Sequence, residues 1–561
     1  MAIVAEEDAK LDRFLQWLQV NGGQLQGCSI KYCGPSKGYG IFSSPAAGSV
    51  SDGNGVLMVI PLNLAITPMR VLQDGSLGPR CAEMFKEGHV DDRFLMVLFL
   101  TVERLRRNSP WKPYLDMLPS TFSSPLWFSG DELSELKGTS LYQATLLQKK
   151  RLQTLFDDKV KSLVEEILQL EGKAESGREV QFEDFLWANS VFWTRALNIP
   201  FPHSYVFPSP VGDATSACDG SNLKISSSQI AMLTMEKERC AEESSSLDGE
   251  TVWVEGLIPG IDFCNHGLEV STTWEVDKTG CVSAVPLSMY LISVAPDFMD
   301  AEKEICISYG NKGNEELLYL YGFVVENNPD DYLMVHYPVE ALQNVALSDS
   351  KAQLLEMQRV ELRCLLPRTL LDHGFTSGKV IKDFDKNENS HSHHSGYSWS
   401  GQRKAPSYLN KLIFPGEFLN SLRTISLQEH ELIRVSELLE QLTGSNEQRQ
   451  PSNEDVKAAV WEAAGDFGAL QLLVDLLYTK LQELEEGSGT EASDVELLES
   501  FCSSEKHAEE TSGCGVVGDG DAQMSRNRRA SVIYRCGQKR LAKLFLKEAE
   551  YILELCSSEI S

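Results

Sequence analysis

The chain has 561 residues, of which 81 are acidic and 51 are basic, so its formal net charge at neutral pH is −30. A charge of this sign repels phosphate backbones and anionic lipid at long range, so we expect binding neither to nucleic acid nor to a membrane. A chain of this length is expected to form two or three domains, because a domain typically holds about 100 to 200 residues. No apolar run reaches the roughly 18 residues that a membrane span requires.

The cysteines and the first residues indicate the compartment. Thirteen cysteines are scattered without a CxxC pair, which is typical of a reducing compartment. The start MAIVAEEDAK lacks the basic flank and apolar core of a signal peptide and the Arg- and Ser-rich composition of a transit peptide. We therefore expect a cytoplasmic protein, with the nucleus as the alternative, and we expect it to be a monomer.

The first part of the chain predicts a β module interrupted by helices. LDRFLQWLQVNGG predicts an amphipathic helix within residues 1–23 that ends at paired glycines. The short runs CSIKYCG, GYGIFSS and GVLMVIPLNLAIT predict strands. Apolar residues at helical spacing then predict a helical insertion at about 76–245. Strand-like runs return at TVWVEGLIPG, CVSAVPL, YLISVA and KEICISYG, so residues 24–325 are interpreted as one interrupted β module.

The remaining residues, 335–561, have helical periodicity, as in AGDFGALQLLVDLLYTKLQEL. Two biased segments, at about 383–404 and 484–526, hold few apolar residues and are predicted to be disordered. The first contains His391, His393 and His394. A metal site needs rigid support around its ligands, and the Ser, Asn and Gly around these histidines predict a loop, so we expect no metal.

Separated motifs carry a family resemblance. They are SKGYGIF at Ser36, WTRAL at Trp193, GIDFCNHG at Gly260 and EICISYGNKGNEELLYLYGF from Glu304. Together with WKPYLDMLPSTFSSPLWFSGDELSELKGTSL and VIYRCGQKRLAKLFLKEAEYIL, they resemble the SET-domain protein methyltransferases of the RuBisCO large-subunit methyltransferase type. The resemblance implies an α+β fold: a SET domain in residues 24–325 and an all-α substrate-binding domain in residues 335–561.

The same resemblance implies S-adenosyl-L-methionine as the cofactor. It places the cofactor-binding residues at Lys37, Gly38, Tyr39, Arg195, Asp262, Asn265, His266 and Phe323. The chain departs from the family pattern at two motifs, with TRAL where SRAF is usual and with Lys37 where an acidic residue is common. The role of Arg195 survives the first departure, because Thr194 is similar to Ser.

Two tyrosines are the expected catalytic residues. Methyl transfer from a sulfonium to an amine requires alignment and a neutral nucleophile. A nearby sulfonium charge and an apolar channel both lower the pKa of a lysine from its usual value near 10.4, so no strong base is needed. We expect Tyr309 to orient the amine and Tyr321 to wall the channel. The resemblance implies a protein-lysine N-methyltransferase that acts on a non-histone protein. The alternatives are a protein-histidine N-methyltransferase and a catalytically silent SET scaffold.

Overall fold

The computed structural model describes residues 2–34, 37–44, 55–88, 90–170, 179–207, 251–294, 302–376, 406–443, 450–511 and 525–560. The chain divides into two compact units, one formed by Met1–Phe122 with Leu147–Asn311 and the other by Ser123–Leu146 with Lys312–Ser561. Within the described ranges, no helix is long and apolar enough to cross a membrane. The predicted segment at 383–404, with its three histidines, lies outside the described residues.

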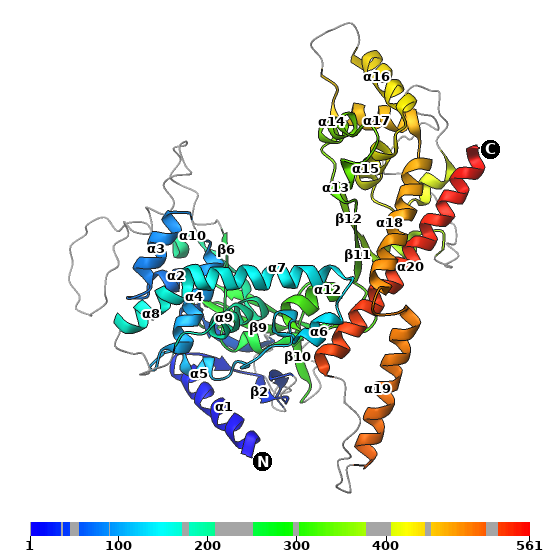
Figure 1. Ribbon diagram of the computed structural model, residues 1–561. Coiled ribbons are helices and arrows are strands. Elements are labelled where there is room, and N and C mark those ends of the chain that lie inside the picture. Colours follow the sequence, from blue (N-terminus) through cyan, green and yellow to red (C-terminus); the bar gives the residue numbers. More distant parts are fainter. Residues whose placement is uncertain are drawn as a thin grey trace. The chain divides into compact units, whose positions relative to one another are not determined.

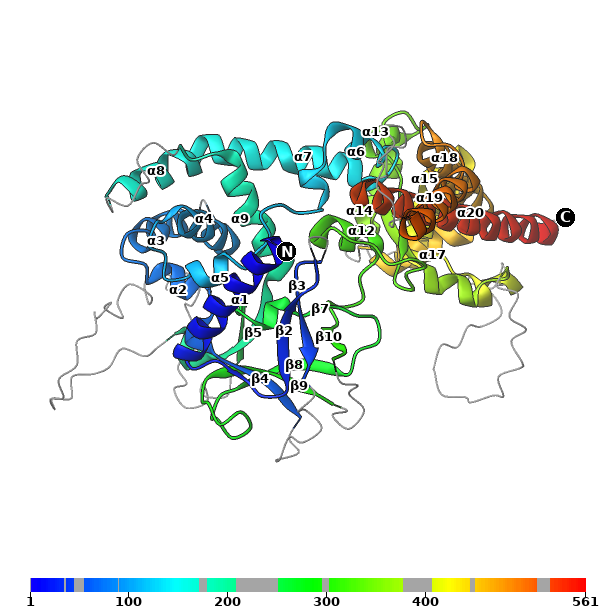
Figure 2. The same cartoon turned by 90° about the horizontal axis from the view of Figure 1, so that it is seen from below.

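Two four-stranded sheets form the framework of the first unit. Their strand orders are β1-β4-β9-β8 and β2-β3-β10-β7, and Figure 2 shows β2, β3, β7 and β10 close together. The bounds are β1 Gln24–Leu25, β2 Cys28–Tyr32, β3 Tyr39–Ser43, β4 Val56–Pro61, β7 Asn265–His266, β8 Thr272–Asp277, β9 Ser288–Ser293 and β10 Glu304–Ile307. Neighbouring strands are antiparallel except β7 and β10, which are parallel.

The helices of the first unit pack around these sheets. Their bounds are α1 Ala2–Val20, α2 Pro68–Leu72, α3 Gly78–Lys86, α4 Asp92–Leu105, α5 Lys112–Leu115, α8 Lys161–Leu170, α9 Phe182–Arg195 and α10 His203–Val206, with short turns η2 Leu62–Leu64, η4 Phe156–Val160 and η6 Ile261–Phe263. Helix α4 starts where the carboxylate of Asp91 accepts the backbone N–H of Phe94, which satisfies one of the unpaired donors of the first turn. Nearly every residue of α4 is buried, and it packs against α9.

Two sequence expectations about strands are wrong. LNIPFP, at the end of the expected helices, forms strand β5 (Leu197–Pro202), which pairs only with β6 (Thr251–Gly256) among the described strands. Prolines are tolerated at such sheet edges. CVSAVPL was expected to be a strand, but residues 281–287 form turns.

The carboxylate of Asp277 explains that turn. It accepts the backbone N–H groups of Gly280, Val282 and Ser283 at 2.7 to 2.9 Å, so the chain folds back on itself immediately after β8. Burial alone would raise the pKa of Asp277, but these hydrogen bonds hold it well below its ordinary value. A run that looks like a strand is therefore held in a turn by the preceding acid.

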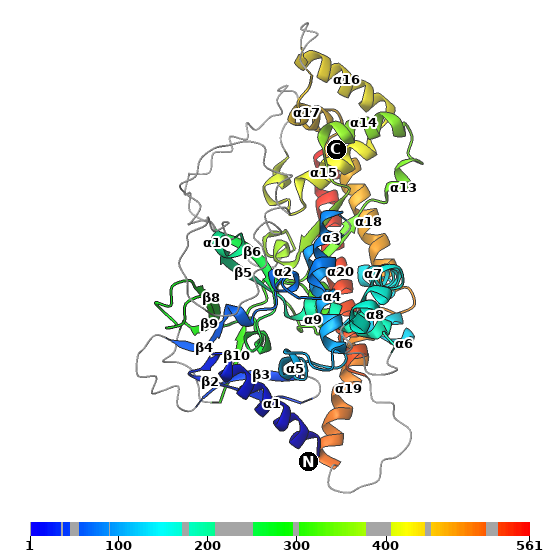
Figure 3. The same ribbon diagram turned by 90° about the vertical axis from the view of Figure 1, so that its left-hand side faces the viewer.

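The second unit is mostly helical. Its elements are η3 Pro125–Trp127, α6 Gly130–Ser134, α12 Asn314–Glu316, η8 Leu317–Tyr321, β11 Tyr332–His336, α13 Val339–Leu342, α14 Ser348–Gln358, β12 Arg363–Pro367, η9 Arg368–His373, η10 Ser407–Lys411, α15 Gly416–Ser426, α16 Glu429–Thr443, α17 Asn453–Ala464, α18 Phe467–Glu485, α19 Glu491–Thr511 and α20 Arg526–Ile560. Helix α7 (Ser140–Leu155) begins in this unit and continues into the first. Helices α18 and α20 lie side by side (Figure 1) and supply much of the core, and Figure 3 shows α14, α15, α16 and α17 gathered together.

The predicted disorder at 484–526 is wrong for its first part. Helix α18 runs to Glu485, and α19 then forms a long helix. The carboxylate of Asp494 on α19 is buried and accepts hydrogen bonds from Arg535 at 2.7 Å and from Lys539 at 2.7 Å, both on α20. Charge pairing with a distant helix, rather than apolar composition, thus orders the acidic segment. Residues 512–524 lie outside the described residues.

A hydrogen-bond network shapes the segment that carries Tyr321. The backbone N–H and side-chain amide of Asn314 donate to the two oxygens of Asp331 at 2.6 and 3.1 Å. The side-chain oxygen of Asn314 accepts from the backbone N–H of Val325 at 2.7 Å. Between these anchors the chain makes the short π-helical turn η8 and then reverses at Gly322, whose φ is +77°. The motif GNEELLYLYGF is therefore a closed structural loop.

We predict that Gly322→Ala lowers the free energy of unfolding of the second unit by about 2 kcal/mol or more. An alanine Cβ at this position would lie 2.5 Å from the carbonyl carbon of Ser123 and 2.8 Å from the nitrogen of Ser124, both of which are backbone atoms that cannot move away cheaply. The matched control is Gly487→Ala, because Gly487 has a similar φ of +76° with nothing within 4 Å of the added Cβ. Chemical unfolding of both variants measures the difference, and equal losses would contradict the steric explanation.

Candidate functional site

The site is built on the turn between β6 and β7. Gly260 adopts a left-handed φ of +105°, which favours glycine and turns the chain into η6. The backbone N–H of Gly260 donates to Asp262 Oδ1 at 3.0 Å, and the hydroxyl of Tyr114 donates to Asp262 Oδ2 at 2.6 Å. Burial raises the pKa of the Asp262 carboxyl, an effect that the nearby Arg195 opposes. Asp262 therefore supports the turn from inside, and its expected role in cofactor binding remains a prediction.

Arg195, the last residue of α9, connects that helix to the turn. One terminal nitrogen donates to the carbonyl oxygen of Asp262 at 2.9 Å and lies 3.5 Å from its carboxylate. The guanidinium also lies over the ring of Phe263, 5.4 Å from the centroid. The buried Nε of Arg195 finds no hydrogen-bond partner among the described residues. A buried donor without a partner is costly, so this edge of Arg195 is suited to an anionic ligand.

The Asn-His pair forms strand β7, whose parallel pairing with β10 brings Tyr309 to the turn. Asn265 and His266 pair with Cys306 and Ile307 of β10. The backbone N–H of Tyr309 donates to Nδ1 of His266 at 3.2 Å, and the two rings lie 5.2 Å apart. Because Nδ1 accepts this bond, it is not the nitrogen that carries the ring proton. The structure thus brings Asn265, His266 and Tyr309 together.

The hydrogen bond of the Tyr309 hydroxyl has a defined direction. The hydroxyl donates to the backbone carbonyl oxygen of Cys264 at 2.8 Å. A hydroxyl has one proton and two lone pairs, so with its proton committed to Cys264 the Tyr309 oxygen can only accept hydrogen bonds from other groups. An acceptor of this kind is suited to the N–H of an amine.

The loop at residues 37–39 closes the same site from β3. Gly38 has a φ of +71° with nothing within 4 Å of where a Cβ would lie, so the backbone here is open to close approach. The hydroxyl of Tyr39 donates to the carboxylate of Glu7 on α1 at 2.7 Å. Burial, followed by this bond to Glu7, raises the pKa of Tyr39 far above its usual value. Tyr39 is therefore a neutral hydroxyl that fixes the loop against α1.

Glu304 is one of two residues of this site that the sequence did not predict. Its carboxylate pairs with the ammonium of Lys37 and accepts the side-chain amide of Asn265 at 2.8 Å. A signal was present in EICISYG, because alternate residues of a strand share a face and Cys306 is the β10 partner of Asn265. That periodicity places Glu304 on the face of Cys306. Tyr114, the donor to Asp262, was missed as well, and no local pattern marks it.

Tyr321 and Phe323 lie in the second unit. Tyr321 ends the turn η8, and its ring centroid lies 6.2 Å from that of Phe323. Burial raises the pKa of Tyr321, so its hydroxyl is neutral at physiological pH. Their expected roles at the channel and at the cofactor remain predictions.

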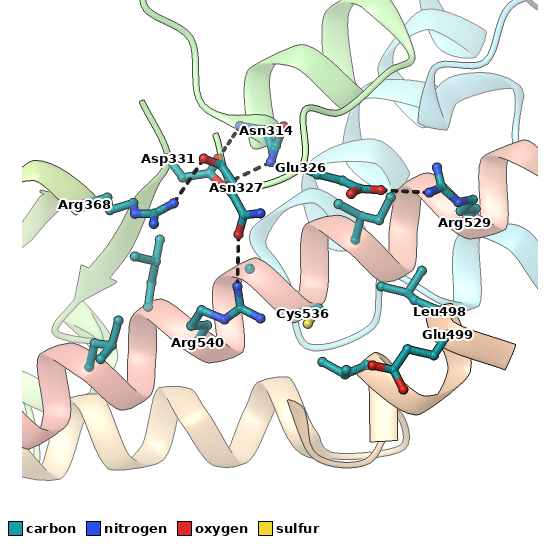
Figure 4. Close-up of a pocket in the computed structure, with 15 residues that line it drawn as sticks. Asn314, Glu326, Asn327, Asp331, Arg368, Leu498, Glu499, Arg529, Cys536 and Arg540 are labelled. Carbon is teal, nitrogen blue, oxygen red and sulfur yellow. Dashed lines mark hydrogen bonds and ion pairs between the residues drawn. The ribbon is translucent and has the colours of Figure 1, made fainter. Parts of the chain in front are cut away.

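The second unit contains a cavity of about 540 Å³ that is distinct from these residues. Figure 4 shows Asn314, Asp331, Asn327 and the guanidinium groups of Arg368 and Arg540 along its wall. Burial raises the pKa of Asp331 to about 6. None of the residues predicted for cofactor or catalysis lines this cavity, although Asn314 and Asp331 also hold the segment that carries Tyr321.

Comparison with known proteins finds similarity to several protein methyltransferases. No family model matches the chain. It is 29% identical over 280 residues to the chloroplastic [fructose-bisphosphate aldolase]-lysine N-methyltransferase of Arabidopsis thaliana, covering 49% of this chain and 44% of that protein. It is 26% identical over 245 residues to the actin-histidine N-methyltransferase of Danio rerio, covering 43% of this chain and 31% of that protein. The matches thus span about half or less of these relatives.

Solved structures show the same fold. The SET domain of LSMT bound to lysine and AdoHcy superposes with a TM-score of 0.58 at 18% identity, covering 97% of this chain and 92% of that chain. A structure of Rubisco LSMT bound to AdoMet gives a TM-score of 0.57 at 17% identity, covering 98% and 93%. The predicted α+β SET fold followed by a helical domain is confirmed.

Proposed function

We propose that the chain is an S-adenosylmethionine-dependent protein-lysine N-methyltransferase, related to the RuBisCO large-subunit methyltransferase-like SET-domain proteins that it resembles in sequence and fold. The observation that carries the proposal is the convergence of Arg195, Asn265, His266 and Tyr309 on one turn. These residues come from α9, β7 and the segment after β10, and all four are among those that the resemblance implies for the cofactor and the amine.

The residues present fit the cofactor. S-adenosylmethionine has a carboxylate and an ammonium at one end, and when bound it supplies a methyl group on a positively charged sulfonium. The unpartnered Nε of Arg195 is suited to the carboxylate. The open backbone at Gly38 and the fixed turn at Asn265 and His266 offer polar groups held in place by the fold, and small-molecule sites use a few such groups to fix orientation.

The proposed role of Tyr309 is to align the target amine for attack on the methyl group. Its hydroxyl is anchored on the carbonyl of Cys264 and accepts an N–H of the target amine, which holds the amine's own lone pair in a fixed direction. Positioning of this kind can contribute several kcal/mol to a displacement reaction. In the proposed reaction no residue acts as a strong base, because the target lysine loses its proton to water once its pKa is lowered in the channel.

The substrate is proposed to be a lysine of a non-histone cytoplasmic protein. The names of two relatives specify aldolase-lysine and ribosomal lysine methylation, and a third names the RuBisCO large subunit, which supports a non-histone protein substrate. Relatives named as actin-histidine N-methyltransferases keep histidine as the second candidate. A tyrosine at position 321 favours lysine, because a planar imidazole would need a wider pocket there.

Methyl-labelled S-adenosylmethionine tests the proposal. The chain is incubated with the labelled cofactor and a cytosolic extract, and the labelled residue is identified by mass spectrometry, with the extract alone as the control. We expect label on a lysine that depends on the added chain. Label on a histidine would establish the alternative reaction, and a chain that binds the cofactor but transfers no label would favour the scaffold.

A further inference from the structure

The carboxylate of Glu304 bonds to a neutral amide, that of Asn265, and to a charged ammonium, that of Lys37. Glu304 is the first residue of β10, next to Phe42 of β3, and Figure 2 shows β3, β10 and β7 as neighbours. One oxygen accepts the side-chain amide of Asn265 at 2.8 Å, and the other pairs with the ammonium of Lys37. The carboxylate therefore bridges the loop at residues 37–39 and the Asn-His turn, the two segments assigned to the cofactor.

Gly40 provides the space for this arrangement. A Cβ at Gly40 would lie 2.9 Å from Glu304 Oε1 and 3.2 Å from the side-chain amide nitrogen of Asn265. Any larger residue would displace the carboxylate or the amide. The absence of a side chain at position 40 thus lets Glu304 reach Asn265 beneath the loop.

The ion pair of Glu304 with Lys37 is easier for a ligand to replace than its hydrogen bond with Asn265. The side chain of Glu304 is 19% exposed and that of Lys37 is 44% exposed, and ion pairs with this much access to water contribute little. The ammonium of Lys37 can therefore dissociate from Glu304 at a small cost in free energy. The amide of Asn265 is on a paired strand, so Glu304 keeps its position when Lys37 moves.

We propose that Glu304 binds the α-ammonium of the cofactor's amino-acid end and that Lys37 is a counter-ion that the cofactor displaces. This inference rests on the proposed function. A carboxylate held by a neutral amide is a preorganised acceptor for a cation, and the charge-assisted hydrogen bond it makes is stronger than a neutral one. Arg195 and Glu304 would then recognise the two opposite charges of one zwitterion.

The test uses two variants of the Lys37–Glu304 ion pair, one that removes the anion and one that removes the cation. Glu304→Gln is expected to weaken binding of S-adenosylhomocysteine by about 10-fold, because the ammonium loses its charged acceptor. Lys37→Gln is expected to tighten binding by about twofold or more, because the competing cation is gone. If the pair were only a structural contact, both variants would weaken binding. Calorimetry measures all of these affinities.

A truncated ligand and a matched variant sharpen the result. 5′-Methylthioadenosine lacks the amino-acid end, so Glu304→Gln should change its affinity by less than about twofold. Glu302→Gln makes the same chemical change at an acid that is 66% exposed and lies 3.9 Å from Lys31, and it should leave both affinities unchanged.

The outcomes separate the inference from the proposed function. If the parent binds S-adenosylhomocysteine and Glu304→Gln binds it equally well, the inference is overturned and the proposed function stands. Weaker binding by Lys37→Gln would overturn the inference in the same way. A parent that binds neither ligand would overturn the proposed function, and the inference with it.

Discussion

Replacement of Tyr309 by Phe is expected to slow methyl transfer by roughly 10²-fold or more, by analogy with loss of one preorganised polar contact made in the transition state. The hydroxyl of Tyr309 is fixed by its bond to the carbonyl of Cys264, and Phe retains the ring while removing that oxygen. S-adenosylmethionine affinity should therefore change little. Single-turnover methylation at saturating cofactor, on the substrate that labelling identifies, measures the rate.

Tyr290 provides a control for the loss of rate that we expect in Tyr309→Phe. The hydroxyl of Tyr290 on β9 donates to the carboxylate of Glu275 at 2.6 Å, so Tyr290→Phe also removes a partly buried hydrogen bond in the first unit. We expect that variant to methylate at the parent rate. A Tyr309→Phe protein that keeps the parent rate would contradict the proposed role of its hydroxyl.

Removal of the Asp494 carboxylate is expected to have the largest effect on stability. Asp494→Ala should lower the free energy of unfolding of the second unit by about 3 kcal/mol or more, because a buried charge without its partner is strongly destabilising. Lys539 is fully buried and pairs with Asp494 at 2.7 Å, while Arg535 donates to the same carboxylate. Urea unfolding followed by circular dichroism measures the change.

Two further variants test whether charge is the cause. Glu496→Ala alters an exposed acid on the same helix and should change stability by no more than about 0.5 kcal/mol. Asp494→Leu combined with Lys539→Met removes two of the three charges at similar volume, and Arg535 keeps its second partner, Glu135; replacing a buried pair in this way is often neutral. The double variant should therefore be more stable than Asp494→Ala. Equal losses in Asp494→Ala and Glu496→Ala would show that α19 is not held by this pair.

Sequence motifs could predict which residues lie close together where those motifs fall on adjoining elements. GIDFCNHG and EICISYG fall on β7 and β10, whose pairing brings Asn265, His266 and Tyr309 together. Arg195 was found through its motif at the end of a helix. Glu304 was missed because strand alternation indicates only the face on which it lies, whereas its role depends on contacts with Lys37 and Asn265 that the pattern does not specify.

Composition misled the prediction for the acidic segment near the C-terminus. The stretch from Glu491 has few apolar residues, which is typical of disorder. What orders it is a set of pairings between Asp494 on α19 and Arg535 and Lys539 on α20. Pairings between residues so distant in the chain have no periodic signature. Side-chain contacts also misled the prediction at CVSAVPL. There the carboxylate of Asp277 binds backbone N–H groups of the following turn, which overrides the local preference for a strand.

A crystal structure of the chain with S-adenosylhomocysteine tests the central claim most directly. The account predicts the amino-acid end of the ligand against Arg195, Asn265 and Glu304, with the ammonium of Lys37 displaced from the Glu304 carboxylate that it pairs with here. It also predicts the hydroxyl of Tyr309 still bonded to the carbonyl of Cys264. A ligand bound elsewhere, or bound here with the Lys37–Glu304 pair intact and no contact to Glu304, would contradict it.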